Sequence, residues 1–128
     1  NRKSASEAVD KAYESAVIIK GIKFVKASFV DATVDALRDS ADKIVAKDDT
    51  AVCLFSTVID GKVLLVSACG ANAVKMGAHA GNLLKSISPI LGGGGGGRPD
   101  SAQAGGKDAS GIDAALSAAV ETVKEQVK

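Results

Sequence analysis

Residues 51–69 of this chain read AVCLFSTVIDGKVLLVSAC. Two apolar runs rich in β-branched residues flank Asp60-Gly61, and an Asp-Gly pair between such runs is the strongest short signal for a β-hairpin. Both faces of both runs are largely apolar, which is typical of strands covered by helices on each side of a sheet. The stretch therefore predicts a hairpin at the centre of a sheet, with strands over residues 51–59 and 62–69.

The two cysteines of the chain lie within this hairpin. A two-residue turn pairs Cys53 with Ala68 and puts Cys69 on the opposite face, whereas a three-residue loop would set the two cysteines against each other. We expect two buried free thiols. A content of only two cysteines indicates a reducing compartment, either the cytoplasm or the interior of an organelle. A metal site is not expected, because His79 is the only histidine and the sequence has no CxxC pair.

The segments around the hairpin alternate between strand and helix patterns. In chain order we expect a strand over residues 22–30, a helix over 33–47, the hairpin, a helix over 80–91, a strand over 100–104 and a helix from 112. Gly92 ends the second helix, whose last turn Pro89 makes irregular, and residues 110–113 have the form of a capping box for the third. The exposed side of the first helix carries charges, Arg38 among them, that we interpret as a solvated face. These elements predict an α/β domain on a mixed sheet, with its central hairpin flanked by helices.

The N-terminal residues carry a heptad pattern. Small and apolar residues recur there at alternating steps of four and three, namely at Ala5, Val9, Ala12, Ala16 and Ile19. This pattern predicts the end of a separate helix that Gly21 stops, so we divide the chain into a helical segment over residues 1–20 and a globular domain over 21–128. The helix either packs on its own domain or belongs to a longer dimerising helix. Asn1 in place of methionine indicates a piece of a longer protein.

Composition and motifs narrow the classes of function. The net charge of +1 gives no general signal for nucleic-acid binding, and no run of about 18 apolar residues is present to span a membrane. The sequence holds no GxxxxGK[ST] phosphate loop, and one histidine without clustered acids makes neither a catalytic triad nor a metal pair. No catalytic residue is therefore expected, and the chain is predicted to be a binding module.

Six consecutive glycines occupy residues 92–97 and lead into Arg98. Ordering such a run is unfavourable by roughly 0.5–1 kcal/mol per glycine relative to alanine, so the presence of six glycines calls for a structural or functional explanation. It serves either as a flexible linker or as a bare backbone that a phosphate or the face of a base approaches closely. Residues 98–128 are too few for a second core, which favours the bare backbone. The segment is also locally basic, because Asp100 is the one acid between residues 70 and 107, against Lys75, Lys85, Arg98 and Lys107.

Residues 92–106, GGGGGGRPDSAQAGG, resemble the C-terminal domain of alanyl-tRNA synthetases. The hallmark of that family is a string of glycines, then Arg-Pro-(Asp/Asn)-x-Ala-Gln-Ala-Gly-Gly, then a closing helix; Ser101 stands where the family usually has Met or Phe. The hairpin and the helix around Ala80-Gly81 and Leu84 are also similar, so the resemblance extends from about residue 22 to the C-terminus. The wider group is the domain associated with DHH phosphoesterases, whose members tend to carry Gly-Gly-His where this chain has Gly97-Arg98.

The resemblance implies a non-catalytic domain that binds the outer corner of tRNA and helps to present the tRNA to aminoacylation and editing domains. The parent would ligate alanine to tRNA with ATP, Mg and Zn, and no cofactor is expected in this segment. The expected partners are tRNA, the remaining synthetase domains and a second copy bound through residues 5–19. No membrane partner is expected. Alternatives are the nucleic-acid-gripping domain of a DHH-type phosphoesterase, a free-standing editing protein, and an assembly module in which the glycine loop is merely a turn.

Recognition of tRNA would then rest mainly on the backbone. Glycine amides and flat peptide planes approach unstacked bases or phosphates, Arg98 adds charge and a stacking plane, and Gln103 offers a hydrogen bond. Lys85 and Lys107 contact phosphates, unless they are ordinary solvated charges, and Gln103 could instead satisfy the backbone of its own loop. The candidate tRNA-binding residues are Gly92, Gly93, Gly94, Gly95, Gly96, Gly97, Arg98, Gln103, Lys107 and Lys85.

Overall fold

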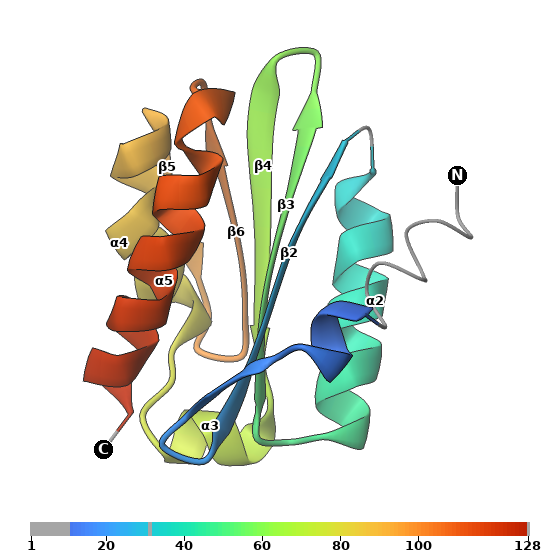
Figure 1. The fold of residues 1–128 in the computed structure, drawn as a ribbon, viewed down its shortest axis with the longest axis vertical. Helices are drawn as coiled ribbons and strands as arrows, with labels where there is room; N and C mark the ends of the chain where they lie inside the picture. The colour runs from blue at the N-terminus through green and yellow to red at the C-terminus, as the bar shows by residue number, and fades with distance from the viewer. Residues whose placement is uncertain (1–10, 31, 128) are drawn as a thin grey trace.

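A mixed sheet of six strands, in the order β1-β2-β3-β4-β6-β5, lies between helices on both of its faces (Figure 1). The computed structural model describes residues 11–30 and 32–127. The strands are β1 (Val17–Ile19), β2 (Ile22–Val30), β3 (Ala51–Ile59), β4 (Lys62–Cys69), β5 (Gly94–Gly97) and β6 (Ser101–Gly106). The helices are α2 (Val34–Lys47), α3 (Ala71–Lys75), α4 (Ala80–Ile87) and α5 (Ile112–Gln126), with 3₁₀ turns at Ser88–Leu91 and Ala109–Gly111. The predicted α/β class is confirmed.

The central hairpin has the predicted bounds and the predicted two-residue turn. Ile59 pairs with Lys62, and Cys53 therefore pairs with Ala68. Asp60 and Gly61 have φ values of 52° and 77°, the left-handed conformation that a type I′ turn requires at both central positions. Pairing of β3 with β2 and of β4 with β6 places the hairpin in the middle of the sheet.

Two separate apolar cores lie on the two faces of the sheet. The first is formed under α2 by buried side chains that include Val25, Leu37, Ala41, Ile44, Cys53 and Phe55. The second is larger and lies under α4 and α5, with Phe24, Leu54, Cys69, Leu83, Leu84, Ala119 and Val123 among its members. The two cysteines belong to different cores and are both free thiols, as the two-residue turn predicts.

The N-terminal segment differs from the helix predicted over residues 5–19. Residues 11–14 are helical, but Val17–Ile19 form β1 and pair antiparallel with β2. Lys20-Gly21 makes the connecting turn, with φ values of 51° and 89°. Three consecutive β-branched residues next to such a turn gain ladder pairing with β2, and this pairing outweighs the helical period.

The seam residues that the structure describes pack within the domain. Ala12 and Ala16 pack against the core under α2, and Ile19 is buried in the core under α4 and α5. This arrangement favours the interpretation in which the segment packs on its own domain. The remaining seam positions, Ala5 and Val9, lie outside the described residues.

Three further local features differ from expectation. The capping box predicted over residues 110–113 is wrong, because Gly111 is the N-cap of α5 and makes no side-chain hydrogen bond; Asp108 instead accepts from the backbone N of Ser110 at 3.0 Å. Helix α3 was not expected, and part of the glycine run is a strand, β5, where no regular element was predicted. The irregular turn at Pro89 is confirmed as a 3₁₀ turn, which Gly92 ends at a φ of 70°.

Tyr13 fixes the N-terminal segment to the end of α2. Its hydroxyl donates to Asp48 Oδ2 at 3.0 Å, and the ammonium groups of Lys23 and Lys47 lie 4.5 and 4.3 Å from its ring centre. Asp48 also accepts from the hydroxyl and the backbone N of Thr50, at 2.6 and 3.1 Å. The hydrogen bond from the Thr50 hydroxyl is the main reason why the pKa of Asp48 lies below its ordinary value.

Replacing Asp48 by asparagine is expected to lower the free energy of unfolding by about 1 kcal/mol at neutral pH, because charge-assisted hydrogen bonds are lost. A carboxylate whose folded pKa is depressed contributes stability above its unfolded pKa of about 3.9, and this contribution disappears as the pH falls through the folded value. The free energies of unfolding of the variant and the unaltered chain, measured with urea, should therefore converge in acid. Asp49→Asn, at the exposed neighbouring position, is the control and should change little. A difference that persists unchanged in acid would contradict this role of Asp48.

Candidate nucleic-acid interface

The glycine run lies at one edge of the sheet. Gly94–Gly97 form β5, which pairs antiparallel with β6 from Gly94 opposite Gly105 to Gly97 opposite Ala102. The sheet ends at β5, so no described strand pairs with its outer edge. Four of the six glycines are exposed and two are half-buried. Main chain without side chains is therefore open to an incoming ligand along this edge, which we call the glycine ribbon (residues 92–97).

Close backbone packing explains why several of these residues are glycines. A Cβ atom on Gly95 would lie 2.5 Å from both Cα and Cβ of Ala104, and one on Gly93 would collide with the carbonyl oxygen of Gly105. By contrast, a Cβ atom on Gly94 would meet nothing within 4 Å. The ribbon is thus tightly packed toward β6 and, at Gly97, close to Gly81 of α4, while Gly94 is open.

Backbone hydrogen bonds fix the turn that joins β5 to β6. At the start of α4, Ala80 N donates to Pro99 O at 2.9 Å and Gly81 N donates to Arg98 O at 3.2 Å. Cys69 N donates to Asp100 O at 3.0 Å from the end of β4. The main chain of the turn is therefore held from two sides, while the side chain of Arg98 remains exposed.

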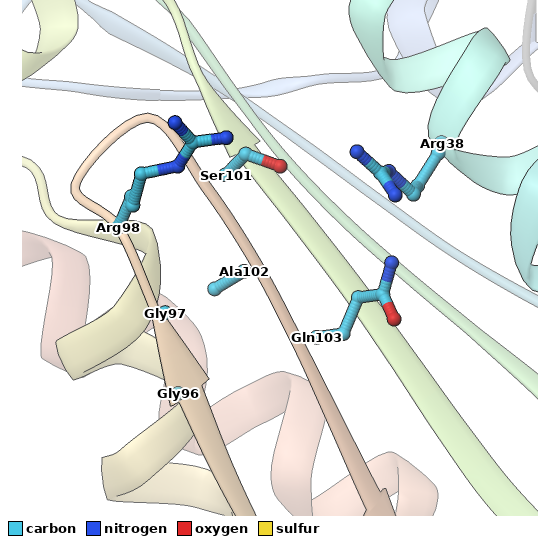
Figure 2. A pocket seen from close by; sticks show the side chains of 7 residues that line it. All are labelled: Arg38, Gly96, Gly97, Arg98, Ser101, Ala102 and Gln103. Atoms are coloured by element: carbon cyan, nitrogen blue, oxygen red, sulfur yellow. The ribbon is translucent and has the colours of Figure 1, made fainter.

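An open cleft of about 250 Å³ lies beside this turn, and Figure 2 shows the side chains that line it. Arg98 comes from the turn, Gln103 from β6 and Arg38 from α2; the other lining residues are Gly96, Gly97, Ser101 and Ala102. The structure thus brings two predicted side chains and two predicted glycines together. It adds Arg38, which the sequence pattern assigned to a solvated helix face.

Lys85 and Lys107, the other two predicted side-chain contacts, do not line the cleft. Lys85 is exposed on α4, and its Cγ would be 3.8 Å from a Cβ atom on Gly96, so its stem passes along the ribbon. Lys107 follows β6, and its backbone N donates to Leu91 O at 2.8 Å. It is six positions beyond Ser101, about 20 Å at the usual strand rise. Lys85 therefore borders the ribbon, whereas Lys107 marks its far end.

His79 and the two cysteines have roles in the fold rather than in the cleft. His79 is the N-cap of α4, where its Nδ1 accepts from Asn82 N at 3.0 Å. Burial raises the pKa of the Cys69 thiol to about 12 and raises that of Cys53 as well, so both stay protonated at neutral pH. Within residues 11–30 and 32–127, no three His, Cys, Asp or Glu side chains gather as a metal site, and no helix has the length and apolarity to cross a membrane. What the cleft and ribbon offer a ligand is guanidinium, amide and bare backbone.

Comparison with known proteins gives consistent matches. The family model described as the DHHA1 domain matches residues 21–125. The chain is 40% identical over 126 residues to alanine–tRNA ligase 1 of Lachnoclostridium phytofermentans, and 44% identical over 125 residues to the alanine–tRNA ligase of Acetivibrio thermocellus. Each alignment covers 98% of this chain and 14% of the relative, so the chain spans about one seventh of the curated relatives' length.

A solved structure has the same fold. The crystal structure of the C-Ala domain from Aquifex aeolicus alanyl-tRNA synthetase matches with a TM-score of 0.79 at 22% sequence identity. The match covers 86% of this chain and 98% of that domain. The chain therefore shares the fold of that domain over most of its length.

Proposed function

The chain belongs to the DHHA1 domain family, and from that membership we propose that it is the tRNA-binding C-terminal domain of an alanine–tRNA ligase. The names of its relatives and its 14% share of their length support this assignment over a phosphoesterase or a free-standing editing protein. Ligation of alanine to tRNA with ATP, Mg and Zn would belong to other parts of the parent. The domain itself holds the tRNA, in the reducing compartment that its cysteine content indicates.

One observation carries the proposal: an exposed edge strand of glycines lies beside a guanidinium that has no carboxylate within 4 Å among the described residues. Bare peptide planes allow a base or a phosphate to approach the main chain closely. Arg98 supplies charge and a planar group on which a base stacks. Gln103 supplies an amide for the edge of a base or a sugar hydroxyl, and Lys85 a charge beside the ribbon.

Arg98→Ala is expected to weaken binding of a tRNA-Ala transcript about tenfold, which corresponds to about 1.4 kcal/mol. The dependence of log affinity on log salt should also become shallower by about 0.7–0.9, the contribution of one phosphate contact. Fluorescence anisotropy across a salt titration measures both quantities. The midpoint of thermal unfolding should not change, because the side chain is exposed.

The matched control is Lys75→Ala, which removes the same charge from an exposed position on α3. It should change the affinity less than twofold. Equal affinities of the Arg98→Ala variant and the unaltered chain would refute the proposed contact.

Self-association through residues 5–19 stays a prediction. Ala12, Ala16 and Ile19 of the seam pack within the domain, and the other two seam positions lie outside the described residues. Sedimentation of a longer chain that includes the preceding residues tests it, and a monomer would rule it out.

A further inference from the structure

The cleft between α2 and the turn before β6 holds two guanidinium groups and one amide (Figure 2). We propose that Arg38 and Arg98 form a clamp for one phosphodiester of an unstacked RNA segment, while Gln103 hydrogen-bonds the adjoining base or sugar. This inference rests on the proposed function and adds the path of the RNA. The RNA crosses the ribbon on the side of α2, where Arg38 was not expected to contribute.

The sheet is open on this side next to α2. The helix packs on β3 and β4, and β6 and β5 continue the sheet beyond it. Gln103 pairs with Val66, whose side chain lies in the core under α2. Directly paired residues project to the same face of a sheet, so Gln103 also projects toward the side of α2, and it is exposed there.

Neither arginine has a carboxylate oxygen within 4 Å in the described part of the chain. The ion pairs found there join Lys23 to Asp48 and Lys124 to Glu121. Figure 2 shows Arg38 and Arg98 reaching toward the same space from opposite sides. Two like charges that face one space repel, and an anion between them relieves this repulsion. Phosphate suits the site because each planar guanidinium can donate two parallel hydrogen bonds to its oxygens.

Acidic residues on α2 limit where the RNA can run. Asp35, Asp39 and Asp42 line a second hollow with Arg38 on the exposed side of the helix. Phosphates placed over this hollow would be repelled by the carboxylates. The ligand is therefore confined to the cleft, which suits one extended strand of a loop better than a duplex that continues across α2.

Arg38→Ala in the 128-residue chain tests the clamp. Fluorescence anisotropy with a labelled tRNA-Ala transcript and with a short labelled single-stranded RNA should each show a loss of affinity of about tenfold. The salt dependence should become shallower by about 0.7, as expected for one lost phosphate contact on a single strand. Arg38→Lys should recover only part of the affinity, because an ammonium group cannot make the paired hydrogen bonds.

Two further variants separate the clamp from a general effect of charge. Lys43→Ala removes one charge from an exposed position of α2 away from the cleft, and it should change the affinity less than twofold. Asp39→Asn should strengthen binding about twofold by reducing the repulsion. The double variant of Arg38 and Arg98 should lose less than the product of the two single losses, because both groups hold the same phosphate.

The outcomes distinguish this inference from the proposed function. Equal effects of Arg38→Ala and Lys43→Ala, or fully independent losses in the double variant, would overturn the clamp. If Arg98→Ala weakens binding but Arg38→Ala does not, the clamp is wrong and the proposed function stands. If neither variant weakens binding, the proposed Arg98 contact is wrong as well, whereas an unaltered chain that does not bind the tRNA-Ala transcript would refute the proposed function. Circular dichroism and thermal unfolding of each variant verify that Arg38→Ala and its controls remain folded.

Discussion

Gly95→Ala is expected to lower the free energy of unfolding by about 3 kcal/mol, the upper range for adding a methyl group to a tightly packed site. The new Cβ atom would lie 2.5 Å from Cα and Cβ of Ala104 and 2.7 Å from the carbonyl oxygen of Gln103. These atoms belong to β6, which is held between β4 and β5 and cannot withdraw without breaking its pairing. Urea unfolding followed by circular dichroism measures the loss.

Gly94→Ala is the matched control in the same strand. A Cβ atom there would have no neighbour within 4 Å, so the free energy of unfolding should change by no more than about 0.5 kcal/mol. If the two substitutions had equal effects, close packing against β6 would not be the reason for glycine at position 95.

Gly81→Ala is expected to destabilise the domain by about 2 kcal/mol, although helix propensity alone would make alanine stabilising at this position. Alanine stabilises a helix by about 1 kcal/mol relative to glycine. In α4, however, the added Cβ atom would collide with the carbonyl oxygen of Gly97 and lie 2.9 Å from its nitrogen. The helix would have to move away from the ribbon, so the affinity for tRNA should fall together with the stability.

Ser86→Ala supplies the comparison for this prediction. Ser86 is exposed on the same helix, where only propensity acts, and alanine should stabilise the domain by a few tenths of a kcal/mol. Urea unfolding should show a lower free energy of unfolding for Gly81→Ala and a higher one for Ser86→Ala. A gain of stability with Gly81→Ala would contradict the close contact between α4 and the ribbon.

Local signals explain which elements could be predicted. The Asp60-Gly61 turn sets the register of the hairpin without any knowledge of distant residues, and its bounds were correct. Helix α2 begins after Thr33, whose hydroxyl accepts from Ala36 N at 3.1 Å, and such caps are readable from sequence. The hairpin and α2 were therefore predicted correctly from their own residues.

Elements whose own residues favour another conformation were missed. Glycine has low strand propensity, and β5 exists because β6 and α4 lie against it. Strand β1 is short and depends on pairing with β2, while the heptad pattern of the same residues favoured a helix. The capping box failed because Asp108, two positions earlier than Ser110, supplies the side-chain bond instead.

The candidate site was predictable only in part, because one of its side chains comes from a distant part of the chain. The glycine string and Arg98 are contiguous in sequence, and Gln103 follows on the partner strand. Arg38 lies far away in the chain among acids on an exposed helix face, and a solvated charge is the simplest interpretation of that pattern. Its position beside the cleft depends on the strand order β3-β4-β6-β5, which no local motif determines.

In the proposed complex, RNA contacts the glycine ribbon beside Arg98. The most direct measurement is a nitrogen-15 correlation spectrum of the labelled chain, titrated with a minimal RNA that carries the outer corner of tRNA-Ala. The largest changes are expected in the amide signals of Gly94–Gly97, Arg98 and Gln103, with little change in β1 and α5. Saturable binding that leaves the ribbon amides unchanged, with its effects confined to another surface, would contradict this contact.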